Sequence, residues 1–259
     1  MLAFALAVPA AAQAPAEVLR RYKADEATQG VAVDATHFYA VANSQIGKYD
    51  RATGRRVALW TGDPARYPHM NSCNVIGREL VCASSNYPAT PMTSSVEVFD
   101  PARMVHLRSI PLGRQVGSLT WVDRQGGAWW AGFANYDGRG GEPGRDHRQS
   151  ALVKFDDQWR NRGQWTFPPS VLDRFKPYST SGGAWGPRGR LYVTGHDLGE
   201  VYELQLPVGG TELRHVGTWR APIEGQAIAM DKRDGRVIFG INRPTREVVQ
   251  MRLPRAETK

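Results

Sequence analysis

Three side chains in the second half of the sequence could carry out acid/base chemistry. His196 and Asp197 are adjacent, and Glu224 opens the later run EGQAIAMD. An imidazole titrates near neutrality, and a nearby carboxylate can orient it. Adjacent strand residues point to opposite faces, so a polar loop pair is an equal alternative to a dyad. We predict that His196, Asp197 and Glu224 are catalytic residues. Glu224 could act as a general base or as a cation ligand. The alternative for Glu224 is a structural role, in which its side chain hydrogen-bonds the backbone of the ring.

Amide and aromatic side chains recur at positions that could surround these groups. Asparagine ends a strand-like run at four places, and the fifth such run ends in His196-Asp197. For any single asparagine, capping of its own loop is the alternative role. The predicted substrate-binding residues are Gln29, Asn43, His69, Asn71, Asn86, Tyr87, Asn135, Tyr136, Gln226, Asn242 and Arg243.

A long polar loop, residues 137–147, separates two strand-like runs. Its spaced oxygens could hold Ca²⁺, but the spacing matches neither the EF-hand nor the RTX repeat. A lid is the other interpretation, in which Arg139, Arg145 or Arg148 meets a carboxylate or phosphate; solvent-exposed arginines are the alternative. No other metal ligands or cofactor are predicted.

Known catalytic motifs narrow the chemistry. The sequence has no GxSxG elbow, HExxH motif or P-loop. Glycosidase chemistry needs two or three carboxylates at the site, and here only Glu224 and Asp197 are candidates. The remaining groups favour lactone hydrolysis, cycloisomerisation, cyclisation or β-elimination.

These residues are positioned by a sequence repeat of four predicted strands that occurs five times. First strands are predicted at 28–34, 70–76, 116–123, 181–187 and 224–231. Second strands are predicted at 38–43, 80–87, 128–136, 191–197 and 237–242. Third strands follow each of these, and fourth strands are predicted at 55–60, 106–112, 162–167 and 213–219. The fifth repeat therefore lacks its last strand.

The missing strand is found at the other end of the chain, where residues 16–23 precede the first repeat. Repeated four-stranded antiparallel units closed through both termini are typical of a β-propeller. We predict an all-β, five-bladed β-propeller closed by this N-terminal strand, which completes the last blade. A β-sandwich is the main alternative, but it would not explain five copies of one phrase. In a propeller, the predicted site residues would surround one axial funnel.

Two stretches resemble known propeller families. KYDRATGRRV, echoed by VFDPARMVHLRSI, resembles the third-strand, turn and fourth-strand segment of YncE-like, quinoprotein-like and NHL-type propellers. The opening TQG resembles the first blade of glutaminyl-peptide cyclotransferases, which are five-bladed propellers. Those enzymes carry an essential glutamate in a Gly-Glu-Gly phrase at the next inner strand, where this chain has Asn71-Ser72. The resemblance implies the architecture more than the activity.

The two cysteines lie in Cys73-Asn-Val-Ile-Gly-Arg-Glu-Leu-Val-Cys82. A two-residue turn at Gly77-Arg78 would place them opposite each other at a non-hydrogen-bonded pair, where side chains approach most closely. We predict a cross-strand disulfide in an oxidising compartment. Two buried thiols are the alternative.

The N-terminal segment and the net charge predict where the protein is located and which partners it binds. Residues 1–14, MLAFALAVPAAAQA, are predicted to be a signal peptide, which leaves 15–259 as a single domain in the periplasm or outside the cell. The net charge of +8 has no basic run longer than two residues, so no nucleic-acid partner is expected. We expect no membrane span, a monomer, and a small polar or anionic ligand. A noncatalytic propeller that binds a sugar, peptide or protein is the alternative to an enzyme.

Overall fold

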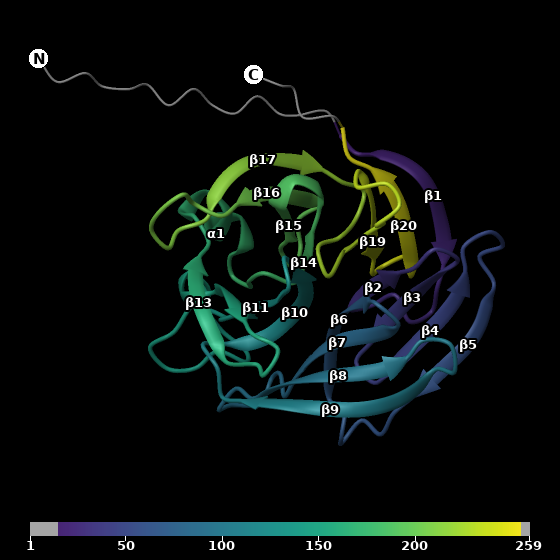
Figure 1. Ribbon diagram of the computed structural model, residues 1–259, viewed down its shortest axis with the longest axis horizontal. Helices are drawn as coiled ribbons and strands as arrows, with labels where there is room; N and C mark the ends of the chain where they lie inside the picture. The colour runs from purple at the N-terminus through teal and green to yellow at the C-terminus, as the bar shows by residue number, and fades with distance from the viewer. Residues whose placement is uncertain (1–14, 255–259) are drawn as a thin grey trace, which may run out of the picture.

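The computed structural model describes residues 15–254, which form five four-stranded antiparallel sheets, or blades, arranged in a ring (Figure 1). Blade one contains β2 (Gly30–Val33), β3 (His37–Ala42), β4 (Gln45–Asp50) and β5 (Arg56–Thr61). Blade two contains β6 (His69–Ile76), β7 (Glu79–Ser85), β8 (Ser94–Asp100) and β9 (Val105–Gly113). Blade three contains β10 (Ser118–Gln125), β11 (Ala128–Ala134), β12 (Ala151–Phe155) and β13 (Asn161–Thr166). Blade four contains β14 (Gly182–Trp185), β15 (Arg190–Thr194), β16 (Glu200–Gln205) and β17 (Arg214–Arg220). Blade five contains β18 (Ala229–Met230), β19 (Val237–Asn242), β20 (Glu247–Arg252) and the N-terminal β1 (Glu17–Lys23).

The predicted five-bladed β-propeller and its closure by the N-terminal strand are confirmed. The predicted signal peptide, residues 1–14, lies outside the described residues. No helix within residues 15–254 has the length and apolar character needed to cross a bilayer.

The apolar core lies in layers between neighbouring blades rather than at the axis. Five clusters of buried residues fill the spaces between successive blades around the ring. The inner strands are buried on both faces, whereas an outermost strand such as β13 alternates exposed and half-buried residues. Trp121 and Trp185 both belong to the layer between blades three and four, so these two indoles pack between blades and do not fill the axis.

Small residues allow the inner strands to meet at the axis. A Cβ added to Gly30 would lie 2.6 Å from the Cβ of Ala227, and one added to Gly182 would lie 2.5 Å from the Cα of Ala227. Both distances are shorter than any normal carbon contact. Gly30, Gly182 and Ala227 therefore allow the innermost segments of blades one, four and five to approach one another closely.

One helix interrupts the all-β pattern. Helix α1 (Pro169–Phe175) lies in the connection between blades three and four, and it buries Val171, Leu172 and Phe175 in the core layer of those blades. No helix was predicted in this connection. Seven residues are too few for a clear helical period, so packing against the blades decides its conformation.

Ring closure rests on β1 and on one buried ion pair. Strand β1 pairs with β20 in antiparallel register, with Tyr22 opposite Val248. Nearby, the Arg51 guanidinium of blade one contacts the Asp231 carboxylate of blade five at 2.6 Å, and both side chains are largely buried. Tyr22 donates to the Arg51 carbonyl oxygen at 3.2 Å. The seam between the first and last blades therefore combines the backbone hydrogen bonds between β1 and β20 with the ion pair of Arg51 and Asp231.

Removing β1 should destabilise the ring sharply. We compare a chain that begins at Ala16 with one that begins at Ala24. The shorter chain exposes the edge of β20 and loses the buried ring of Tyr22, so its free energy of unfolding should fall by more than about 4 kcal/mol. Urea denaturation measures this. Equal midpoints for the two chains would show that β1 does not close the ring.

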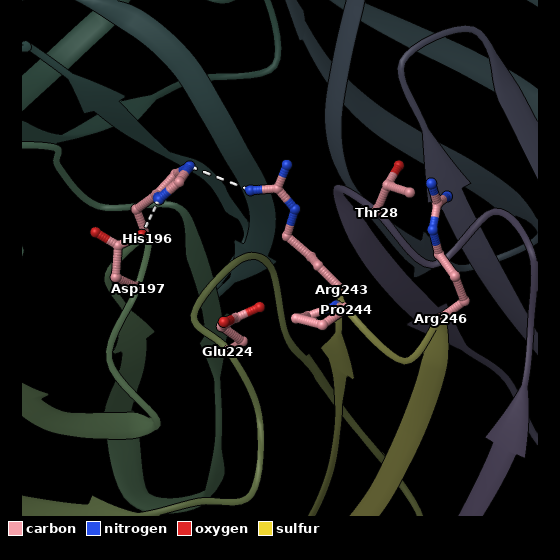
Figure 2. Close-up of a pocket in the computed structure, with 7 residues that line it drawn as sticks. All are labelled: Thr28, His196, Asp197, Glu224, Arg243, Pro244 and Arg246. Carbon is pink, nitrogen blue, oxygen red and sulfur yellow. Dashed lines mark hydrogen bonds and ion pairs between the residues drawn. The ribbon is translucent and has the colours of Figure 1, made fainter.

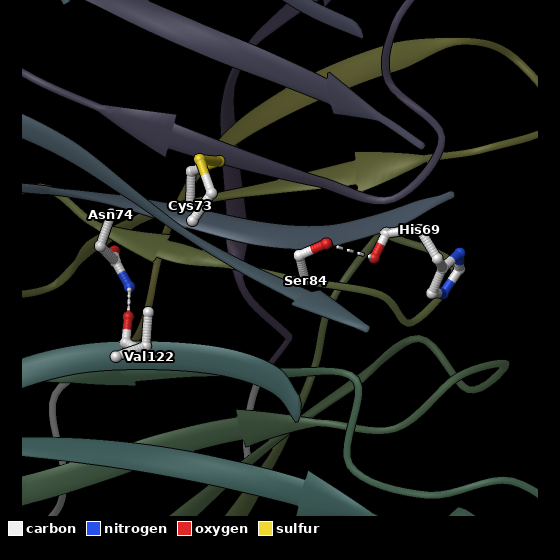
Figure 3. Close-up of a disulfide and its surroundings, with 6 residues drawn as sticks. His69, Cys73, Asn74, Ser84 and Val122 are labelled. Carbon is white, nitrogen blue, oxygen red and sulfur yellow. Dashed lines mark hydrogen bonds between the residues drawn. A yellow bond between two sulfur atoms is a disulfide. The ribbon is translucent and has the colours of Figure 1, made fainter. Parts of the chain in front are cut away.

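The predicted disulfide between Cys73 and Cys82 is confirmed. The two residues lie opposite each other in β6 and β7 with a Cα–Cα distance of 4.0 Å, in the register expected from a Gly77-Arg78 turn. Figure 3 shows this disulfide at Cys73, next to Asn74, whose amide donates to the Val122 carbonyl of the next blade at 2.9 Å. The covalent bond thus braces a strand pair that also anchors blade three.

Because the disulfide closes a short loop, its loss should have a moderate effect. Chain-entropy arguments give about 2–3 kcal/mol for a loop of roughly ten residues. The double substitution of Cys73 and Cys82 by alanine should lower the free energy of unfolding by that amount, and dithiothreitol should shift the parent but not the variant. Unequal effects of reduction and substitution would point to strain or cavity formation instead.

Candidate functional site

A pocket of about 380 Å³ opens where blades four, five and one meet (Figure 2). It lies beyond the ends of β15 and β19, the second strands of blades four and five. Its lining residues are Thr28, His196, Asp197, Glu224, Arg243, Pro244 and Arg246. The structure therefore brings together all three predicted catalytic residues and one predicted binding residue, Arg243. Their catalytic and binding roles stay predictions.

The His196 imidazole is held on three sides. Its Nδ1 contacts the Asp197 Oδ1 at 2.5 Å, and its Nε2 lies 3.4 Å from Nη1 of Arg243. The Tyr178 ring stacks on it with a centroid distance of 4.0 Å. Because Asp197 accepts and Arg243 donates, the imidazole carries its proton on Nδ1, and its Nε2 lone pair accepts the hydrogen bond from Arg243. His196 and Asp197 are therefore in hydrogen-bond contact although they are adjacent in sequence, and a catalytic role for the pair stays a prediction.

Glu224 is placed by a tight backbone contact. The next residue, Gly225, has φ of +55°, and a Cβ there would lie 2.1 Å from the His196 carbonyl oxygen. The following amide, that of Gln226, donates to the Gly195 carbonyl at 2.9 Å. Only glycine permits this approach at position 225. The segment before β18 is therefore locked onto the loop after β15, which puts the Glu224 carboxylate and the imidazole in one pocket.

Arg243 lacks a carboxylate partner within residues 15–254. Its side chain is half-buried, and its one hydrogen bond goes to the His196 nitrogen. Figure 2 shows its guanidinium directed at His196, with Glu224 lower in the same pocket, and no ion pair joins Glu224 to Arg243. A guanidinium has five donors, so most remain free for a ligand. The pocket thus presents an unpaired cation, an unpaired carboxylate and an oriented imidazole.

His69 approaches the same region from blade two. Its Nδ1 lies 2.9 Å from the Asn43 Oδ1, and its ring packs against Tyr87 at 5.0 Å. Burial lowers the pKa of the His69 imidazole to about 4, and Arg243 and His196 oppose a further positive charge; hydrogen bonding offsets these effects only in part. His69 is therefore a neutral group at pH 7.

The predicted asparagine residues make different kinds of contact. Asn86 and Asn242 bond their own loops: Asn86 receives the Thr93 amide at 2.8 Å, and Asn242 receives the Thr245 amide at 3.4 Å. Asn71 donates to the Leu119 carbonyl of blade three at 2.9 Å. Asn135 donates to two backbone carbonyls within its blade. The capping alternative describes the contacts of Asn86 and Asn242, whereas Asn43 contacts His69.

The remaining predicted binding residues lie around this region without lining the pocket. Tyr87 and Tyr136 are neighbours at 5.0 Å, and Tyr178 packs against the same small apolar cluster. Gln29 is half-buried, and the buried Gln226 has an Nε2 without a hydrogen-bond partner among the described residues.

Sequence reasoning missed Thr28, Arg246 and Tyr178. Arg246 lies three residues after Arg243 in the same turn, and Thr28 precedes Gln29, so proximity to predicted residues was a usable signal. Tyr178 lies in the α1 insertion, whose path the repeat pattern did not determine.

The loop proposed for Ca²⁺ brings Asp137, Asp146 and His147 within 4.8 Å of one another. Each already has a protein partner: His147 Nδ1 contacts Asp137 at 2.6 Å, and Asp146 pairs with Arg148. Burial alone would raise the pKa of Asp137, but the hydrogen bonds from His147 outweigh it and lower that pKa. The hydrogen bond from Arg148 lowers the pKa of Asp146 to about 2. These contacts account for the cluster without a cation, and Ca²⁺ binding stays a prediction.

Comparison with known proteins supports the architecture. No protein-family model matches the sequence, and no curated protein is significantly similar to it. A chain of the mitotic checkpoint complex superposes with a TM-score of 0.51 at 11% identity, covering 98% of this chain and 100% of that one. A luciferin-regenerating enzyme gives a TM-score of 0.54 at 10% identity, covering 94% and 96%. At such low identity these likenesses show the β-propeller fold alone.

The neutral state of His69 makes stability depend on pH. The unfolded chain binds a proton near pH 6.5, whereas the folded chain does so near pH 4. As pH falls through this window the unfolded state gains protons first, so stability is complete above 6.5 and is lost toward 4, by on the order of 3 kcal/mol. Denaturation of the parent and of His69→Gln at several pH values measures the difference in slope. An NMR titration midpoint above 6 for His69 would contradict the assignment.

Proposed function

We propose that the protein is an exported enzyme that hydrolyses a small lactone-type substrate whose product is a hydroxy carboxylate. The observation that carries this proposal is the half-buried Arg243 guanidinium, which has no carboxylate partner among the described residues and lies beside the oriented imidazole of His196. The pocket of about 380 Å³ suits a small molecule. Export is supported by the disulfide, which is typical of proteins from oxidising compartments.

The geometry supports His196 as the general base. Its Nε2 lone pair accepts a hydrogen bond from Arg243 at 3.4 Å, so the proposed reaction requires the guanidinium to turn to the substrate oxygen. Nε2 then takes a proton from a water molecule that attacks the lactone carbonyl. Asp197 on Nδ1 then stabilises the imidazolium. The ester C–O bond breaks, and the proton passes from His196 to the leaving alkoxide. Water is consumed, and no other reactant is needed.

Arg243 would stabilise the oxyanion and hold the product carboxylate. Its free N–H donors make charge-assisted hydrogen bonds to such oxygens, and Arg246 adds positive charge at the same turn. Glu224 repels the carboxylate and so favours the opposite orientation of the substrate, with a hydroxyl group toward Glu224. The same groups suit cycloisomerisation, cyclisation or β-elimination, with Glu224 as the base in the last case.

A noncatalytic binding propeller is the second candidate. It is favoured by the aromatic side chains of Tyr87, Tyr136 and Tyr178, which lie together near the pocket and suit a sugar or peptide partner. This role needs recognition without proton transfer, so substitution of His196 would change affinity and nothing else.

Substitution of His196 by glutamine should reduce kcat by about 10²–10⁴-fold, because the general base is lost while hydrogen bonding capacity remains. Hydrolysis of a panel of aldonolactones, followed by pH-stat, measures the rate. His37→Gln, on the opposite face of blade one, is the matched control and should retain full activity.

Calorimetry with the corresponding aldonates separates the two candidate functions. If the protein is an enzyme, the His196→Gln variant should keep its affinity for the product while turnover is lost. The Arg243→Ala variant should lose that affinity. A parent protein that binds aldonates or oligosaccharides but turns over no lactone would support the binding propeller.

A further inference from the structure

A second pocket lies on the face opposite the candidate active site. It has a volume of about 530 Å³ and lies between blades four and five, at the turns that join their first and second strands. These turns are η2 (Pro187–Gly189) and the segment before β19, which contains Gly235 and Arg236. A Cβ on Gly235 would lie 2.1 Å from Cγ of Pro187, so the two turns are in direct contact.

Three arginines and one carboxylate set the charge of this pocket. Glu203, which is buried, pairs with Arg190 at 3.3 Å and accepts the indole N–H of Trp219 at 3.3 Å. Arg188 and Arg236 also line the pocket, and neither guanidinium has a hydrogen bond or ion pair with the described residues. Arg236 is half-buried, which makes an unpaired cation there costly. The pocket therefore has two cations available to a ligand.

The hairpin turn that carries Arg188 places this residue at the pocket. Arg188 has φ of +59° and ψ of +27°, Gly189 has φ of +66°, and the Arg190 amide donates to the Pro187 carbonyl oxygen. These dihedrals are those of a type I′ turn, which joins β14 to β15 and requires positive φ at both central residues. A positive φ is unfavourable for a residue with a Cβ. The turn nevertheless carries an arginine there, and this exposed residue lines the pocket.

The rest of the lining is apolar and aromatic. Tyr192 and Trp219 contribute rings, and Pro187, Leu253 and Pro254 contribute aliphatic surface. A planar carboxylate bonds bidentately to guanidinium groups, while an attached ring suits the aromatic and proline surfaces. We propose that this pocket binds a small aromatic carboxylate, with Arg188 and Arg236 as the anion-binding residues. This site is independent of the function proposed for the pocket at His196.

The proposal is tested with 2-naphthoate as the probe, using calorimetry and the NMR signal of the Trp219 indole N–H, assigned by Trp219→Phe. We expect saturable binding that shifts this signal. The neutral analogue 2-naphthamide should not bind measurably, since it lacks the anion. Equal binding of the amide would overturn the proposal.

Four variants locate the site. Arg188→Gly and Arg236→Gln should each weaken naphthoate binding at least fivefold, and Arg188→Gly should also raise the melting temperature because it removes the strained backbone. Arg78→Gly is the matched control: Arg78 lies in the corresponding turn of blade two, without a positive φ, and its loss should leave affinity unchanged. Arg243→Ala should likewise leave it unchanged. Unchanged affinity in Arg188→Gly, or its loss in Arg243→Ala, would contradict the proposal.

Discussion

The pairing of β1 with β20 is the constraint on which the rest of the structure depends. Four blades are built from consecutive strands, but the fifth needs a strand from the other end of the chain. An open ring would leave the edge of β20 unpaired and the layer between blades five and one exposed. Closure also fixes the inner strands at their close approach, where Gly30 meets Ala227. Each blade thus packs against two neighbours around the closed ring.

The candidate active site lies on this same seam, so closure of the ring also assembles the pocket. The turn between β19 and β20 carries Arg243 and Arg246, and the residues after β1 hold it: the Ala24 amide donates to the Arg246 carbonyl at 3.0 Å, and Arg246 donates to the Asp25 carbonyl at 2.9 Å. Thr28 follows directly on the pocket wall. Loss of β1 would therefore free the turn that positions the Arg243 guanidinium, so the stability of the ring and the geometry of the candidate site depend on the same strand pair.

The fold could be predicted from sequence because the alternation of strands and turns repeats five times. The strand missing from the last repeat could be found at the N-terminus by the same pattern. The register of Cys73 and Cys82 followed from the turn at Gly77 for the same reason. The face that bears the site was equally predictable, since it depends only on which strand ends point the same way. Helix α1 and Tyr178 were not predictable, because the insertion between blades three and four has no counterpart in the other repeats.

The hydrogen-bond partners of individual asparagine side chains could not be predicted from the repeat pattern. Asn43 and Asn242 occupy equivalent positions in blades one and five, yet one bonds His69 of the next blade and the other bonds its own loop. The difference lies in the neighbour: His69 stands beside Asn43, whereas Asn242 is followed by the Arg243–Arg246 turn, whose amides it can reach. A side-chain amide satisfies whichever buried or orphaned polar group is nearest. Its direction is therefore a property of the assembled ring, which a repeat pattern does not encode.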